Sequence, residues 1–135
     1  MSCQEYKTVI RARVPLRTKD KHKAYLFFKD KLGEPTEVDY SDKENTIVDY
    51  FDYDSSCKFV PIIDYYEHEY QYYVDYIIKH NYGYSEKIDR GNLSISEVYK
   101  ISQELAILFN IDIDQDIKQI SYDWYNGTDE PADFD

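Results

Sequence analysis

Residues 64–84 read DYYEHEYQYYVDYIIKHNYGY, and eight of the sixteen tyrosines in the 135-residue chain lie in this stretch. Asp64 followed by Glu67 is similar to a capping box, in which the first residue caps a helix and the fourth reaches back to its start. Residues at helical spacing would then form one buried face: Tyr66, Tyr70, Tyr73 and Ile77. We therefore expect a helix that begins at Asp64 and ends near Asn81.

The rest of the chain alternates between expected strands and helices. Alternation of apolar and polar residues predicts strands over 8–14, 36–40, 46–53 and 119–124. The apolar run 58–63, interrupted by Pro61, predicts an edge strand or the approach to the helix that follows it. Helical spacing predicts further helices over 18–32 and 94–110, and Ser94 with Glu97 forms a proper capping box at the start of the second.

This order of elements indicates an α+β fold, with a small antiparallel sheet and about three helices packed mainly on one face. We expect a single globular domain over residues 1–127, followed by an acidic, disordered tail over residues 128–135. In the first strand, Ile10 and Val14 should face the core while Arg11 and Arg13 point away from it. In the third strand, Ile47 and Phe51 should share one face.

The chain is strongly acidic, with 27 aspartates and glutamates against 16 lysines and arginines and a formal net charge of −11. Nine of the basic residues lie within residues 1–35. Five of these could contact a nucleic-acid backbone: Arg11, Arg13, Lys19, Lys21 and Lys23. We favour the alternative that this basic edge balances the acidic remainder of the same fold, because a domain of net negative charge repels nucleic acid.

The sequence contains no signal for secretion or for a membrane. Residues 1–11 lack the apolar run of a signal peptide, and no stretch approaches the roughly 18 apolar residues that span a bilayer. Cys3 and Cys57 form no C-x-x-C motif. We therefore expect a cytoplasmic protein with reduced thiols and no membrane contact.

One acidic segment is similar to part of a calcium-binding loop. Asp112, Asp114 and Asp116 alternate, and Asp123 stands at position twelve of the pattern. Ile117 occupies the sixth position, where the sharp turn needs glycine, so an exit from a helix into a strand explains the segment better. Three histidines share no ligand spacing and are expected at the surface: His22, His68 and His80. With no nucleophile motif and no glycine-rich phosphate loop, we expect no enzyme activity, no cofactor and no metal.

The region from Asp39 to Tyr84 is the strongest candidate for function, because tyrosines there alternate with carboxylates. Tyrosine combines an apolar body with a polar tip and is favoured in protein-binding surfaces. We expect an array of charges formed by Asp49, Asp52, Asp54, Asp64, Glu67, Glu69 and Asp75. The expected aromatic anchors are Tyr65, Tyr72 and Tyr76, on a ridge of the helix over 64–81.

These features predict an acidic, stoichiometric inhibitor that covers the basic surface of a nuclease or another nucleoprotein component, without binding nucleic acid itself. In composition the chain resembles the compact acidic inhibitors with which phages and mobile elements mimic nucleic acid and counter host defence. An immunity protein that neutralises a cognate toxin would show the same features. A divalent-metal-binding domain or an enzyme built on the acidic cluster near Asp112 is a further alternative.

Overall fold

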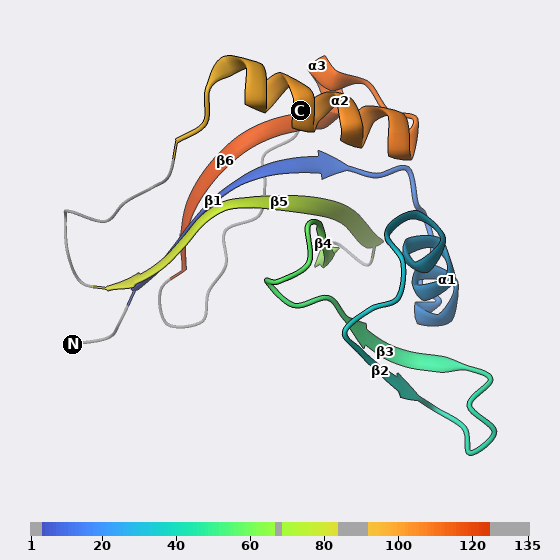
Figure 1. Ribbon diagram of the computed structural model, residues 1–135. Coiled ribbons are helices and arrows are strands. Elements are labelled where there is room, and N and C mark those ends of the chain that lie inside the picture. Colours follow the sequence, from blue (N-terminus) through green and yellow to red (C-terminus); the bar gives the residue numbers. More distant parts are fainter. Residues whose placement is uncertain (1–3, 67–68, 84–91, 125–135) are drawn as a thin grey trace.

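The computed structural model describes residues 4–66, 69–83 and 92–124, and its centre is a four-stranded antiparallel sheet (Figure 1). Its strands lie in the order β4 (Val60–Tyr66), β5 (Glu69–Gly83), β1 (Gln4–Arg13) and β6 (Ile117–Trp124). A separate two-stranded hairpin consists of β2 (Glu37–Tyr40) and β3 (Val48–Asp52). The helices are α1 (Lys21–Leu32), α2 (Ile95–Phe109) and the single turn α3 (Ile113–Asp116). The α+β class is therefore confirmed.

The helix expected over residues 64–81 is wrong, because this stretch forms the end of β4 and most of β5. Tyrosine, valine and isoleucine favour strands, and a strand covered on both faces does not show the alternation by which strands are recognised. Residues 72–75 of β5 are all buried, although alternate side chains point to opposite faces. The capping interpretation fails with the helix: Asp64 lies within β4, and Glu67 is outside the described residues.

Strand β1 is buried on both faces in the same way. Ile10, Ala12 and Val14 belong to the main core, where they meet side chains of both long helices. Val9 and Arg11 point to the opposite face and are also buried, so the expected solvent-exposed arginine face is wrong at Arg11. Arg11 can lie there because it is paired with Asp75 of β5.

Arg11 and Asp75 form a buried ion pair between the two central strands. They stand directly opposite each other in the β1–β5 register. The guanidinium donates from Nε to Oδ1 over 2.6 Å and from Nη2 to Oδ2 over 2.8 Å, and each side chain is only 3% exposed. The guanidinium also lies 5.5 Å from the ring centroid of Tyr73. This two-bond geometry satisfies both charges in a place that would otherwise exclude them.

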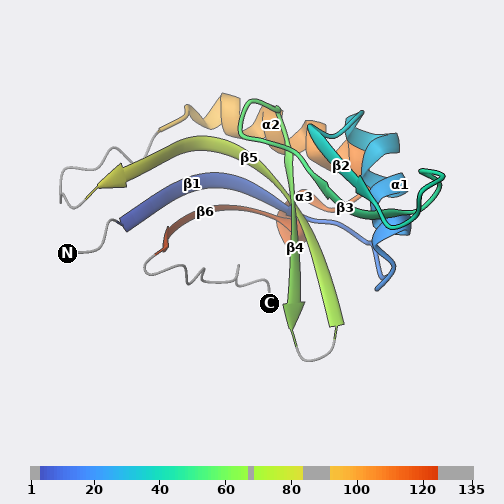
Figure 2. The same ribbon diagram turned by 90° about the horizontal axis from the view of Figure 1, so that it is seen from below.

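The main core fills the space between the sheet, the two long helices and the β2–β3 hairpin. Phe28 of α1 lies 6.1 Å from the rings of Phe51 and Tyr72, and Phe27 lies 6.0 Å from Phe109 of α2. Figure 2 shows β5, β1 and β6 side by side, with the hairpin beside α1 at one end of the sheet. Both long helices thus contribute aromatic side chains to one core.

Local signals explain where the two long helices begin and end. Asp20 caps α1 by accepting a hydrogen bond from the backbone N–H of His22, and Gly33 ends the helix with φ at +90°. Ser94 caps α2 by accepting from the N–H of Glu97, as the capping box predicts. Asn110 ends α2 in the left-handed conformation that asparagine tolerates.

The β2–β3 hairpin contains an irregularity that corrects the face expected for Ile47. Tyr40 pairs with Val48 and Asp39 pairs with Tyr50, so Asp49 is an extra residue in the register. Because of this bulge, Val48 and Phe51 both point into the core although they are three residues apart, and Ile47 is exposed. Pro61 lies in β4 at the edge of the sheet, which is the first of the two alternatives expected for the run 58–63.

Other expectations about the ends of the chain lie outside the described residues. These include the disordered tail over 128–135. Among the described residues, no helix is long and apolar enough to cross a membrane.

Replacing the buried carboxylate should destabilise the fold far more than breaking an exposed ion pair. We expect Asp75→Asn to lower the free energy of unfolding by about 3–5 kcal/mol, because the Arg11 charge stays buried without its counter-ion. Glu104→Gln breaks the exposed Lys58–Glu104 pair and should cost less than about 1 kcal/mol. Urea unfolding followed by circular dichroism measures both values. Similar losses in the two variants would contradict this role for Asp75.

Candidate protein-binding surface

The structure divides the expected charge array between several places. Asp49, Asp52 and Asp54 are exposed on β3 or directly after it. Glu69 is exposed at the start of β5, and Asp64 is half-buried on β4. Asp75 is buried against Arg11, so the prediction that it contacts a partner is wrong. Glu67 lies outside the described residues.

The three expected tyrosine anchors do not form a common ridge. Tyr65 is 58% exposed, whereas Tyr72 is 3% exposed and donates its hydroxyl to the backbone carbonyl of Thr18 over 2.6 Å. Tyr76 is half-buried and lies 6.1 Å from the ring of Phe59. The correction follows from the change of helix to strand, because Tyr72 and Tyr76 point from β5 into the main core.

The exposed side of the β2–β3 hairpin gathers the acidic residues that remain. Glu37 stands opposite Asp52, and Asp39 stands opposite Tyr50. All four point away from the core that Val38 and Phe51 face. Together with Asp49 at the bulge, they form what we call the acidic hairpin face: Glu37, Asp39, Asp49, Tyr50 and Asp52. Residues 34–54 contain eight acids and one lysine, so little positive charge lies nearby in the chain.

Two features of this face show strong negative charge. Like charges directly opposite each other in a sheet are destabilising, and Glu37 and Asp52 are such a pair. Tyr50 lies among these carboxylates, and the pKa of its phenol is raised, first by Asp52, then by partial burial, and then by Glu37 and Asp39. Ionising the phenol would add a further negative charge to the cluster. The repulsion between Glu37 and Asp52 therefore lowers the folding stability of the hairpin.

Hydrogen bonds in the turns at both ends of β3 hold the hairpin in shape. Asp42 accepts hydrogen bonds from the backbone N–H groups of Thr46 (3.0 Å) and Ile47 (3.1 Å), and also from the Thr46 hydroxyl. Asp54 accepts from the N–H and the hydroxyl of Ser56. These bonds, chiefly those from the two hydroxyls, lower the pKa of both carboxyl groups. Asp54 is thus a turn residue as well as a surface charge.

The base of the hairpin is anchored to α1. Tyr53 is buried and donates its hydroxyl to the carbonyl of Gly33 over 2.6 Å, and burial raises its pKa to about 12. At the other end of β3, next to the turn, the backbone N–H of Val48 donates to Nδ1 of His22 in α1 over 2.9 Å. The acidic hairpin face is consequently presented on a supported element.

A small cavity adjoins the acidic hairpin face where the hairpin meets the sheet and α1. Its volume is about 90 Å³. It is lined from α1 and the residues before it by Lys19, Lys21 and Ala24, and from the strands by Asp49, Tyr50, Phe51, Ile63, Tyr70 and Tyr72. We call it the tyrosine pocket.

A larger groove of about 860 Å³ lies beside the connection between β1 and α1. Arg13, Arg17 and Lys19 line it together with Glu69 and Asp116. Arg13 donates to Asp116 over 3.0 Å, and Arg11 is engaged by Asp75. Two of the five basic residues considered for nucleic-acid contact are therefore paired with carboxylates of the same fold, which favours internal charge balance for those two.

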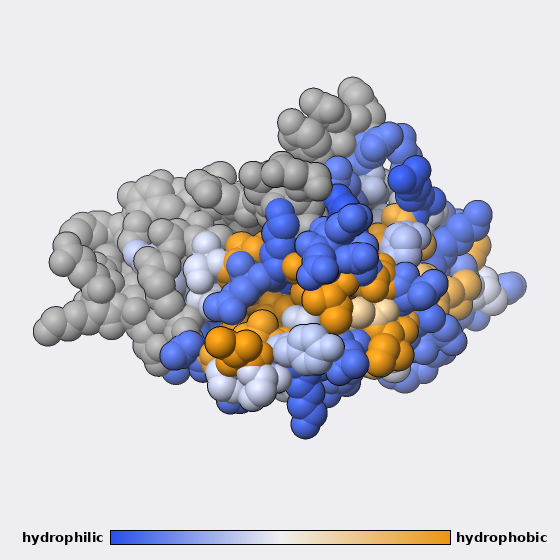
Figure 3. Space-filling model, turned by 90° about the horizontal axis from the view of Figure 1, so that it is seen from above, coloured by the Kyte–Doolittle hydropathy of each residue, from blue (hydrophilic) through white to orange (hydrophobic). Residues whose placement is uncertain are grey.

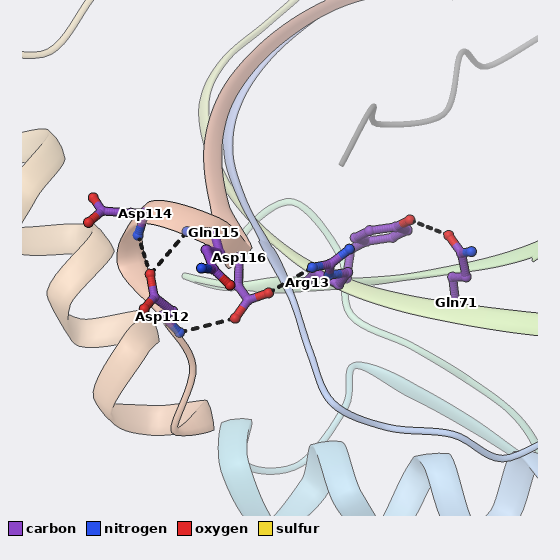
Figure 4. A network of polar contacts seen from close by, with 7 residues as sticks. Arg13, Gln71, Asp112, Asp114, Gln115 and Asp116 are labelled. Atoms are coloured by element: carbon purple, nitrogen blue, oxygen red, sulfur yellow. Dashed lines mark hydrogen bonds and ion pairs between the residues drawn. The ribbon is translucent and has the colours of Figure 1, made fainter. Parts of the chain in front are cut away.

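In the acidic segment near α3, the carboxylates of Asp112 and Asp116 accept hydrogen bonds from other groups of the protein (Figure 4). Asp112 caps the turn by accepting from the backbone N–H groups of Asp114 (2.8 Å) and Gln115 (3.1 Å). Asp116 accepts from the N–H of Asp112 over 3.1 Å and from Arg13. Within residues 4–66, 69–83 and 92–124, no group of three or more histidines, cysteines or acids is placed to hold a metal ion.

Apolar side chains are also exposed on α2, on the side of the molecule seen in Figure 3. The largest are Ile95, Tyr99 and Ile107. Lys100 and Glu104 are exposed on the same helix and interrupt this apolar surface. Scattered apolar residues of this kind are ordinary on folded proteins, and they carry no functional assignment.

Comparison of the chain with models of protein families, with curated proteins and with solved structures found no match. The acidic hairpin face and the tyrosine pocket are therefore the features that bear on function. Sequence reasoning missed Glu37, Asp39 and Tyr50 as members of the first. The signal that could have found them is the two-residue period of the predicted hairpin, which places positions 37, 39, 50 and 52 on one face.

The Tyr50 phenol should report the field of the acidic hairpin face. We expect its pKa to lie above the ordinary value near 10, and Asp52→Asn to lower it by removing the largest contribution. Titration of the tyrosine Cζ resonances by NMR measures this value. Asp30→Asn removes one charge from α1 and should leave the Tyr50 pKa nearly unchanged. An equal decrease in both variants would indicate only the net charge of the protein.

Proposed function

We propose that this protein is a small acidic inhibitor that binds and covers the basic surface of a nucleic-acid-handling protein, without turnover. The observation that carries the proposal is the acidic hairpin face, where Glu37 and Asp52 are held opposite each other around Tyr50. A cationic partner would relieve this repulsion. An arrangement that costs stability in the free protein is thereby favourable in a complex.

The spacing of the charges supports a nucleic-acid-binding partner. Alternate residues on one face of a strand lie about 7 Å apart, and directly opposed residues across two strands lie about 5 Å apart. Glu37 and Asp39 lie along β2 and Asp52 lies across from Glu37 on β3, so the three form a compact cluster of negative charge. Proteins that hold a nucleic-acid backbone present lysines and arginines to closely spaced negative charges of this kind.

The contributions of charge and tyrosine should differ. Exposed carboxylates mainly accelerate association and make it depend on salt, because they act over a distance in water. Tyr50 is 48% exposed at the centre of the face and can lose water on contact, which slows dissociation. The anchored base and the hydrogen-bonded turns of the hairpin reduce the entropy that binding would otherwise cost.

A charge-matched pair of variants tests the proposal. Asp39→Asn/Asp52→Asn removes two charges from the acidic hairpin face, and Asp30→Asn/Asp114→Asn removes two exposed charges elsewhere. The purified protein and both variants are measured by surface plasmon resonance against a panel of nucleases and nucleoprotein complexes. We expect the wild type to bind at least one basic member in competition with its nucleic acid. The hairpin variant should associate about tenfold more slowly, while the control changes little.

The dependence on salt gives a second readout. Raising the salt concentration should slow association of the wild type and of the control, and should affect the hairpin variant less. Binding only to neutral or acidic members of the panel would contradict the proposal. Equal losses in the two variants would mean that net charge, and not this face, determines binding.

A further inference from the structure

The tyrosine pocket is apolar in its depth and polar only at its mouth. Ala24 and Tyr72 are buried, and Phe51 closes it from the hairpin side. Ile63 of β4 is 40% exposed where it lines the pocket. The charged lining residues are Lys19, Lys21 and Asp49, all of which are exposed. An apolar cavity with a charged margin is the arrangement found at the centre of protein interfaces.

Tyrosine rings extend the apolar surface beyond the pocket. Tyr70 lines the pocket, and its ring centroid lies 5.0 Å from that of Tyr65, at an interplanar angle of 55°. Tyr50 belongs both to the pocket and to the acidic hairpin face. The exposed Tyr50 and the half-buried Tyr70 thus line a cavity formed by α1, β3, β4 and β5, and Tyr50 connects this cavity with the carboxylates.

We propose that the tyrosine pocket receives one apolar side chain of the partner, from a residue adjacent to a lysine or arginine that contacts the acidic hairpin face. This inference rests on the function proposed above and adds the chemistry of the segment that is recognised. The buried apolar side chain would anchor the complex, and the neighbouring cation would set its orientation.

The volume of the pocket suits a side chain better than a small-molecule ligand. Pockets for drug-sized ligands range from about 300 to 1,000 Å³, and an engineered apolar cavity of about 150 Å³ is sufficient for benzene. At about 90 Å³, the tyrosine pocket matches a branched aliphatic side chain such as that of leucine. Its apolar lining offers few hydrogen-bond partners to water, so an entering apolar group would displace only weakly held water molecules.

The charges around the pocket favour a cation on the hairpin side. Among the described residues, neither Lys19 nor Lys21 forms an ion pair. The α1 side of the pocket thus carries two positive charges, whereas the acidic hairpin face on its other side carries four carboxylates. Three of these carboxylates raise the pKa of Tyr50. A segment with its basic residue toward β3 is therefore attracted, whereas one with its basic residue toward α1 meets like charge. This polarity restricts the direction in which the segment binds.

Three capped pentapeptides test the inference. One has leucine between two pairs of lysines, one replaces the leucine with alanine, and one keeps the leucine between two pairs of glycines. Each is titrated into isotopically labelled protein and followed by NMR. We expect the lysine–leucine peptide to bind about tenfold more tightly than its alanine counterpart, because leucine buries more apolar surface. The backbone resonances of Ala24, Ile63 and Tyr70 should shift in a way that saturates.

Two variants separate the pocket from the rest of the surface. Ile63→Arg places a long charged side chain at the pocket mouth and should abolish the preference for leucine over alanine. Ile107→Arg makes the same change on α2, at a residue that is 75% exposed and does not line the pocket, and should keep the preference. The dispersed NMR spectrum of each variant shows that it is folded.

Each other outcome has a defined meaning. Equal, salt-dependent binding of the leucine and alanine peptides would overturn the pocket inference and leave the proposed function standing. Equal binding of the lysine–leucine and glycine–leucine peptides would support an apolar pocket but contradict a role for the acidic hairpin face. No binding of any peptide at millimolar concentration would overturn the pocket inference, while the nuclease panel would still test the function separately.

Discussion

The pairing of β1 with β5 is the interaction on which the rest of the structure depends, and Arg11 and Asp75 lie within it. These two central strands hold the helices and the hairpin on one face while their opposite face buries Val9, Tyr73 and the ion pair. A buried pair of charges is seldom the most stabilising choice, since hydrophobic residues of similar volume often do as well. It does, however, specify register, because a shift of one residue would leave two buried charges without partners.

A fixed register matters for the surface, because the tyrosine pocket is formed by elements from distant parts of the chain. Ile63 of β4 and Tyr70 of β5 come from the sheet, whereas Tyr50 comes from the hairpin. A slip of β5 would turn Tyr70 and Tyr72 to the other face. The buried ion pair and the exposed pocket are thus linked through one strand.

The sequence predicted those elements whose signals are local. Ser94 and Glu97 mark the start of α2, and the polar turn between β2 and β3 marks the hairpin. The spacing of residues in β5 predicts a helix because its consecutive buried residues remove the two-residue period, whereas pairing with β4 and β1 on either side makes it a strand. The local hairpin pattern was enough to identify Asp49 and Asp52 as surface charges. The burial of Tyr72 and Asp75 could not be predicted in this way, because it depends on how β5 pairs with its neighbours.

The acidic hairpin face illustrates how a small fold can separate stability from binding. Its opposed carboxylates are exposed, so water screens their repulsion and the cost to folding stays small. Contact with a partner removes that water and strengthens every remaining charge interaction at the surface. Repulsion that is tolerable in the free protein then becomes a strong preference for a cationic surface over a neutral one. Specificity of this kind needs the carboxylates to be held close together, which the anchored hairpin provides.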